Sequence, residues 1–101
     1  MLKTASDWKF LTNHALVLSW ITRKPESTAR EIALAVGITE RTALKIVGEL
    51  DYDGYISRRR SGRRNVYGVN PELPLRNHLE FNVPVGDLLT VIAPRRRRGV
   101  A

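Results

Sequence analysis

Apolar residues recur at helical spacing near the start of the chain, which predicts a first helix over about 12–24 that ends before Pro25. The residues of this spacing are Leu11, Ala15, Leu18 and Thr22. Leu16 and Trp20 fall on a second face of the same helix. Because a short helix with two apolar faces needs two packing partners, we expect a second copy of the chain to be one of them. The alternative is that the leader or the C-terminal segment of the same chain folds back over Trp20.

Two further helices are predicted, joined by a glycine. Thr28 and Glu31 have the spacing of a capping box, and the helix that they begin runs to Gly37, a residue suited to a left-handed helix end. Thr39 is the predicted N-cap of a third helix over about 40–52. The apolar stripe of that helix consists of Ala43, Ile46, Val47 and Leu50.

A hairpin follows over 55–69, with its turn around Ser61 and Gly62. The next segment is extended and broken by prolines, and a short helix is predicted after Pro84. The fold class is therefore α+β: mainly α with a small β-hairpin, made of a three-helix core, the hairpin and a C-terminal helix. We divide the chain into a leader (1–10), a main domain (11–70), a C-terminal extension (71–94) and a basic tail predicted to be disordered (95–101).

The composition narrows the possible chemistry. A chain of 101 residues is expected to form one domain. It has no cysteine, and its two histidines, His14 and His78, lack ligand spacing, so neither a metal site nor a cofactor is expected. No apolar run approaches the ~20 residues of a membrane span, and the first ten residues do not resemble a secretion signal. These features favour a cytoplasmic location.

Positive charge is concentrated in two places. The net charge is +7 at pH 7, with +5 in residues 55–70 and +4 in residues 95–101, whereas residues 28–54 carry −2. A localised basic surface is typical of a protein that binds a polyanion. A solvated surface or a disordered tail would have the same composition. The hairpin itself contains no acidic residue that could neutralise its arginines, which favours an external anion.

The segment REIALAVGITERTALKIVGELDYDGYISRRRSGRRNVYGVNPELPLR resembles small prokaryotic winged helix-turn-helix transcriptional regulators, the broad group that includes MarR-like and ArsR-like proteins. The resemblance extends upstream to LTNHALVLSWI and downstream to VGDLL. It implies that the third helix enters the major groove of double-stranded DNA, that the hairpin lies on phosphates or in the minor groove, and that the protein is a homodimer.

Specific residues follow from the resemblance and from the helical pattern. Base contacts are expected from Thr39, Arg41, Thr42 and Lys45. Contacts with phosphates or the minor groove are expected from Thr28, Arg58, Arg59, Arg60, Arg63 and Arg64. The candidates for nonspecific DNA contact in the tail are Arg95, Arg96, Arg97 and Arg98. The candidate dimer contacts are Leu16, Trp20, Leu88, Leu89 and Ile92. Leu44, Gly48 and several acidic residues on the third helix depart from the family pattern, so sparse reading of bases is expected.

The expected function is that of a DNA-binding transcriptional regulator. One alternative is a winged-helix module that binds an acidic protein, and another is a sequence-independent architectural or RNA-binding protein. We do not expect an enzyme, because the sequence has no Ser-His-Asp set, no glycine-rich phosphate loop and no plausible catalytic carboxylate pair. The sequence assigns neither an operator nor an effector.

Overall fold

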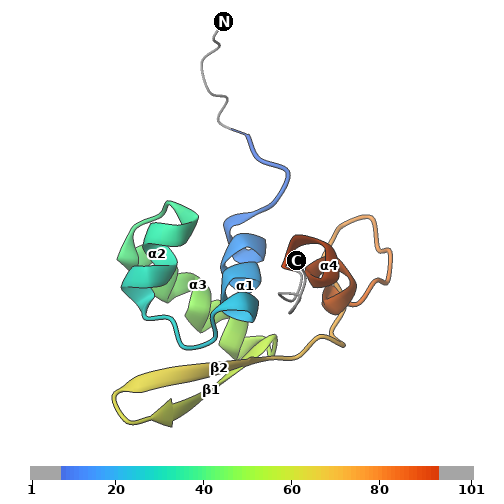
Figure 1. Cartoon of the computed structure of the whole chain (residues 1–101). Coiled ribbons are helices and arrows are strands. Elements are labelled where there is room, and N and C mark those ends of the chain that lie inside the picture. The colour runs from blue at the N-terminus through green and yellow to red at the C-terminus, as the bar shows by residue number, and fades with distance from the viewer. Residues whose placement is uncertain (1–7, 94–101) are drawn as a thin grey trace, which may run out of the picture.

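The structure is a computed structural model that describes residues 8–93. Within this range it has an α+β fold made of four helices and one two-stranded antiparallel hairpin (Figure 1). The elements are α1 (Asn13–Arg23), α2 (Ala29–Val36), α3 (Glu40–Tyr52), β1 (Ile56–Ser61), β2 (Arg64–Val69) and α4 (Val85–Ile92). Helices α1, α2 and α3 pack together on one side of the hairpin, and α4 lies beside α1.

Helix α1 forms where the sequence predicts it, but its buried face differs from the predicted stripe. Val17, Leu18 and Ile21 are buried, whereas Thr22 is exposed and its hydroxyl donates to the carbonyl of Leu18. The prediction is therefore wrong at Thr22. Because α1 contacts α2, α3, β2 and α4, it buries a broad face, and apolar spacing alone does not locate the centre of that face.

The boundaries of α2 and α3 confirm the predicted local signals. The Thr28 hydroxyl accepts from the amide of Glu31 at 3.1 Å, and the Glu31 carboxylate accepts from the amide of Thr28 at 2.8 Å. Gly37 ends α2 with φ of +85°, a conformation that a residue with a side chain rarely adopts. Thr39 caps α3, and all four residues of the predicted stripe are buried. A side-chain cap of this kind contributes about 1 kcal/mol to helix stability.

The hairpin of residues 56–69, which we call the arginine hairpin, is attached to the helices along β2. Its register pairs Ile56 with Val69 and Ser61 with Arg64, and Gly62 in the turn has φ of +64°. The amide of Tyr67 donates to the carbonyl of Pro25 at 2.9 Å, so the α1–α2 loop covers the free edge of β2. The edge of β1 bears the run Arg58–Arg60 and pairs with no other strand in the part of the chain that is described.

The C-terminal part returns to the helices, and α4 forms after Pro84 as the sequence predicts. The prediction of an extended segment is wrong in part, because residues 70–84 contain turns at 71–72 and 78–79 and fold back so that Pro74 bridges Pro84 and the amide of Leu75 donates to the carbonyl of Val83 at 2.8 Å. Helix α4 buries Val85 and Leu89, and the Ser19 hydroxyl on α1 donates to the carbonyl of Ile92 at 3.1 Å. Within residues 8–93, no helix has the length and apolar character that crossing a membrane requires.

Candidate nucleic-acid interface

The outer face of α3 presents two cationic side chains. Arg41 is exposed, and the side chain of Lys45 is 72% exposed. The Lys45 ammonium nitrogen lies 3.3 Å from Oε2 of Glu49, whose Oε1 lies 2.7 Å from Nε2 of His14. The hydrogen bond from His14, followed by the one from Lys45, holds the pKa of Glu49 below its ordinary value. The positive charge of Lys45 is thus partly balanced within the protein, while Arg41 has no ion-pair partner among residues 8–93.

The two threonines predicted to contact bases, Thr39 and Thr42, already use part of their hydrogen-bonding capacity to cap α3. The Thr39 hydroxyl accepts from the amide of Thr42 at 3.0 Å and donates to the Thr42 hydroxyl at 2.9 Å. Thr28 is engaged in the same way by its capping box. The two hydroxyls at the start of α3 therefore retain less hydrogen-bonding capacity than the sequence suggests. Beside them Leu44 is 55% exposed, and the long cationic side chains of this face are Arg41 and Lys45.

The five arginines of the hairpin divide into two groups. Arg58 donates through Nε and Nη2 to Oδ2 of Asp51 on α3, at 3.2 and 3.0 Å. Arg64 donates to the carbonyl of Glu26 at 2.6 Å and lies 3.7 Å from Oε1 of Glu31 on α2. The hairpin itself holds no acidic residue, but α3 and α2 supply acidic partners to these two arginines, so an external anion is not needed to balance them. Their partners belong to helices that are distant in sequence, which inspection of the hairpin alone could not reveal.

Arg59, Arg60 and Arg63 take part in no ion pair within the described range 8–93. Side chains alternate between the two faces of a strand, so Arg58 and Arg60 share the face that carries buried Ile56 and Tyr67. Because Arg58 contacts α3 from that face, Arg60 lies on the α3 side of the hairpin and Arg59 on the opposite side. Arg63 occupies the turn. Arg60 is thus the unpaired hairpin cation on the α3 side, and Arg63 lies at the tip of the hairpin.

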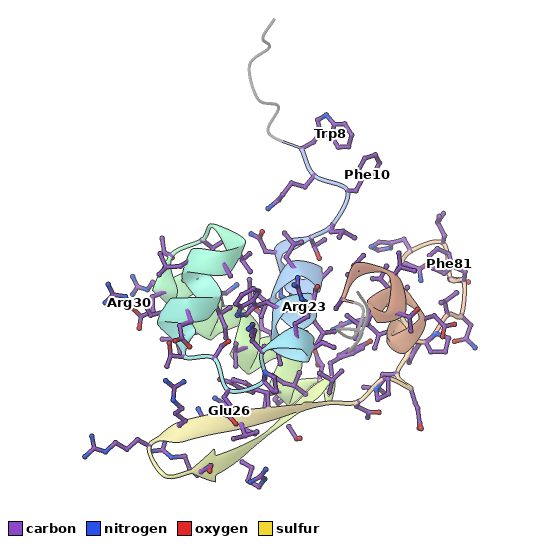
Figure 2. All side chains as sticks on the ribbon, viewed as in Figure 1. Trp8, Phe10, Arg23, Glu26, Arg30 and Phe81 are labelled. Carbon is purple, nitrogen blue, oxygen red and sulfur yellow. The ribbon has the colours of Figure 1, made fainter. Side chains whose placement is uncertain are left out.

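Arg30 is a further candidate for DNA contact, and the sequence alone did not point to it. It is exposed in the first turn of α2, next to Glu31, whose carboxylate approaches Arg64 of the hairpin. Figure 2 shows its side chain pointing away from the body of the molecule. The signal in the sequence was a basic residue beside a capping box, but the proximity of α2 to the hairpin appears only in the structure.

The candidate dimer contacts are largely engaged within the chain. Trp20 is half-buried, and its indole N–H donates to the Ser27 hydroxyl at 2.9 Å. Leu89 lies in the chain's own core, so contact with a second copy would require that core to open. Leu16, Leu88 and Ile92 are half-buried. The residue that bonds Trp20 thus comes from the α1–α2 loop and not from the leader or the C-terminal segment, and the homodimer stays a prediction. The tail candidates Arg95–Arg98 lie outside the described residues.

The described part of the chain has no cluster of three or more histidine, aspartate or glutamate side chains arranged to hold a metal ion. A comparison with protein-family models finds no match, and a comparison with curated proteins finds no significant similarity. The function is therefore inferred from the geometry of α3 and the arginine hairpin.

Proposed function

We propose that the chain is a DNA-binding transcriptional regulator with a winged helix-turn-helix fold. In this proposal α2 and α3 form the helix-turn-helix, α3 enters the major groove, and the arginine hairpin is the wing that contacts phosphates or the minor groove. Arg41 and Lys45 offer hydrogen-bond donors to guanine O6 and N7, and Arg60 and Arg63 neutralise phosphates.

The observation that carries the proposal is the position of exposed cations on two adjacent elements, three of which, Arg41, Arg60 and Arg63, have no ion-pair partner among residues 8–93. Arg58 joins the hairpin to α3 through Asp51, so Arg60, on the same face of β1, lies on the side of the helix that bears Arg41 and Lys45. A B-DNA major groove about 12 Å wide admits one helix, and the phosphates beside it are then within reach of a flanking hairpin. Arginines on an exposed edge strand also discourage strand pairing between molecules, but that role needs no cations on α3.

Selection of bound sequences from a random duplex pool tests the proposal. The expected result is an enriched motif, and a two-fold symmetric motif with half-sites about 34 Å apart would support the homodimer. Enrichment of no motif, together with equal binding of unrelated duplexes, would favour a sequence-independent architectural role. Failure to bind any duplex at low salt would contradict the proposal and favour a protein partner.

Lys45→Ala tests the reading of bases by α3. We expect it to relax preference at one base-pair position at a cost of about 1–3 kcal/mol, measured by competition between the selected site and its single-base variants. Gln substitution of Glu49, which pairs with Lys45, is the matched control because it removes the internal partner and leaves the donor in place. Equal loss of affinity for every duplex in Lys45→Ala would show that Lys45 contacts only phosphate.

A further inference from the structure

A cavity of about 540 Å³ lies between α1, the end of α3 and α4, apart from the proposed DNA-binding surface. Its lining is mainly apolar and includes Leu18, Leu50, Tyr55, Leu75 and Leu89. The volume falls within the range of about 300–1,000 Å³ that is usual for small-molecule sites. The fold holds the cavity open: the Tyr55 hydroxyl donates to the carbonyl of Pro74 and fixes the 70–84 segment opposite α1.

Two ion pairs between different elements form the polar rim of this cavity. His14 on α1 lies 2.7 Å from Oε1 of Glu49, and Nη1 of Arg76 lies 2.7 Å from Oδ2 of Asp53. Glu49 and Asp53 are four residues apart, so their carboxylates lie along the same side of α3. Among the charged residues that line the cavity are therefore two carboxylates and one permanent cation, Arg76, while a second cation, Lys45, approaches Glu49 without lining the cavity.

We propose that this cavity binds a small amphipathic amine, with its apolar body on the leucine side chains and its ammonium group bonded to Glu49 and Asp53. An ionised carboxylate has about four acceptor sites, and the pairs with His14, Lys45 and Arg76 leave several of them for a ligand. An acid of the same shape would bring a third carboxylate to Glu49 and Asp53, and would have to compete with them for Lys45 and Arg76.

The cavity also communicates with the DNA-binding surface, a step that rests on the proposed function. Glu49 lines the cavity, and its carboxylate lies 3.3 Å from the ammonium nitrogen of Lys45. A bound ammonium group competes with Lys45 for this carboxylate, and the released Lys45 is then available to DNA. We expect bound amine to raise affinity for the selected duplex by about fivefold or more, the lower end of usual coupling between two sites.

Three probes with one apolar body test the site on the full chain without DNA: phenylbutylamine, phenylbutanol and phenylbutyrate. We expect the amine to bind about tenfold more tightly than the acid, the effect of a single charge-assisted hydrogen bond. Methyl NMR shifts should move at Leu18, Leu50 and Leu89, with titration to about 10 mM because molecules this small reach only millimolar affinity. Tighter or equal binding of the acid, or no binding of any probe, would overturn the proposal.

Ala15→Phe places a ring in the cavity from a half-buried position on α1, whereas Ala35→Phe changes an exposed position on α2 and is the matched control. Only Ala15→Phe should abolish amine binding. Glu49→Gln changes the rim without filling the cavity and should remove the preference for amine over alcohol, so the proposal can be tested even if Ala15→Phe does not fold. A preference unchanged in Glu49→Gln would refute the assigned contact.

Sedimentation and DNA titration separate the remaining outcomes. A change of oligomeric state in Ala15→Phe but not in Ala35→Phe would show that a second copy covers the cavity, and would overturn the ligand proposal. Amine binding that leaves DNA affinity unchanged would overturn the coupling through Lys45 while supporting the site itself. Absence of DNA binding under every condition would contradict the proposed function and leave the probe titration interpretable.

Discussion

The division of the hairpin arginines into paired and unpaired groups predicts unequal effects on the salt dependence of DNA binding. The informative change is Arg60→Ala with Arg63→Ala, since neither side chain has an ion-pair partner among residues 8–93. Its matched control is Arg58→Ala with Arg64→Ala, which removes the same formal charge from the same hairpin. Those two arginines are already within ion-pair distance of Asp51 and Glu31.

The magnitude follows from counterion release. Each phosphate that an arginine neutralises contributes about −0.9 to the slope of log K against log salt, so loss of Arg60 and Arg63 should flatten the slope by about 1.8 per protomer. The control should change the slope much less. It should lower the free energy of unfolding instead, by about 0.2–1 kcal/mol for each exposed pair, and the Asp51 carboxylate left alone would repel phosphate.

The assay is fluorescence anisotropy with a labelled duplex between about 50 and about 200 mM salt, a range over which several phosphate contacts change affinity by orders of magnitude. Circular dichroism on both double variants confirms that they are folded. Equal flattening by the two variants would refute the distinction between paired and unpaired arginines. An unchanged slope in both would remove the arginine hairpin from the interface.

Three further predictions concern strand orientation, packing and pH. Arg60→Ala should weaken DNA binding more than Arg59→Ala, because Arg59 lies on the face of the hairpin away from α3, and equal losses in a gel shift would contradict this orientation. Gly86→Ala should destabilise the fold by about 1–3 kcal/mol in urea unfolding, because the added Cβ would lie 2.7 Å from Cβ of Pro71. Gly48→Ala should instead stabilise the fold by about 0.5–1 kcal/mol, because the Cβ added there would meet no packed atom within 4 Å and alanine favours a helix over glycine. The pKa of Glu49 is lowered in the folded state, so the ionised carboxylate stabilises the fold above pH 4.5, its ordinary pKa, and this stabilisation is lost as pH falls through the lower folded pKa. The Glu49→Gln variant should therefore be less stable than the natural sequence at neutral pH, and the stabilities of the two proteins should converge in acid.

Local chemistry explains why the helices could be predicted from the sequence. The capping box of Thr28, the glycine at 37 and the N-cap at Thr39 each act within a few residues, and the structure places the ends of α2 and α3 where these signals predict. The stripe of α3 was equally clear, because a helix with one buried face has one periodic pattern. The contacts of α1 with four other elements broaden its buried face, and there the predicted stripe was wrong at Thr22.

The sequence predicted which cationic residues lie at the candidate site, but not which of them form ion pairs within the protein. The sequence shows which residues are cationic, yet the partners of Arg58 and Arg64 come from α3, α2 and the loop before α2. The chain of contacts from His14 through Glu49 to Lys45 likewise joins residues up to 35 positions apart. Such pairings depend on how the elements pack, and no local signal specifies them. The cavity beside α4 could not be predicted for the same reason.

Amide NMR shifts of the protein on addition of a random duplex at low salt test the central claim most directly. Nonspecific binding of a basic domain is expected with a dissociation constant of about 10⁻⁴–10⁻⁶ M. We predict that the largest shifts fall on Arg41, Lys45, Arg60 and Arg63, and that Arg30 shows a smaller shift. Shifts confined to α4 and the 70–84 segment, or no shifts, would contradict the claim that α3 and the arginine hairpin bind DNA.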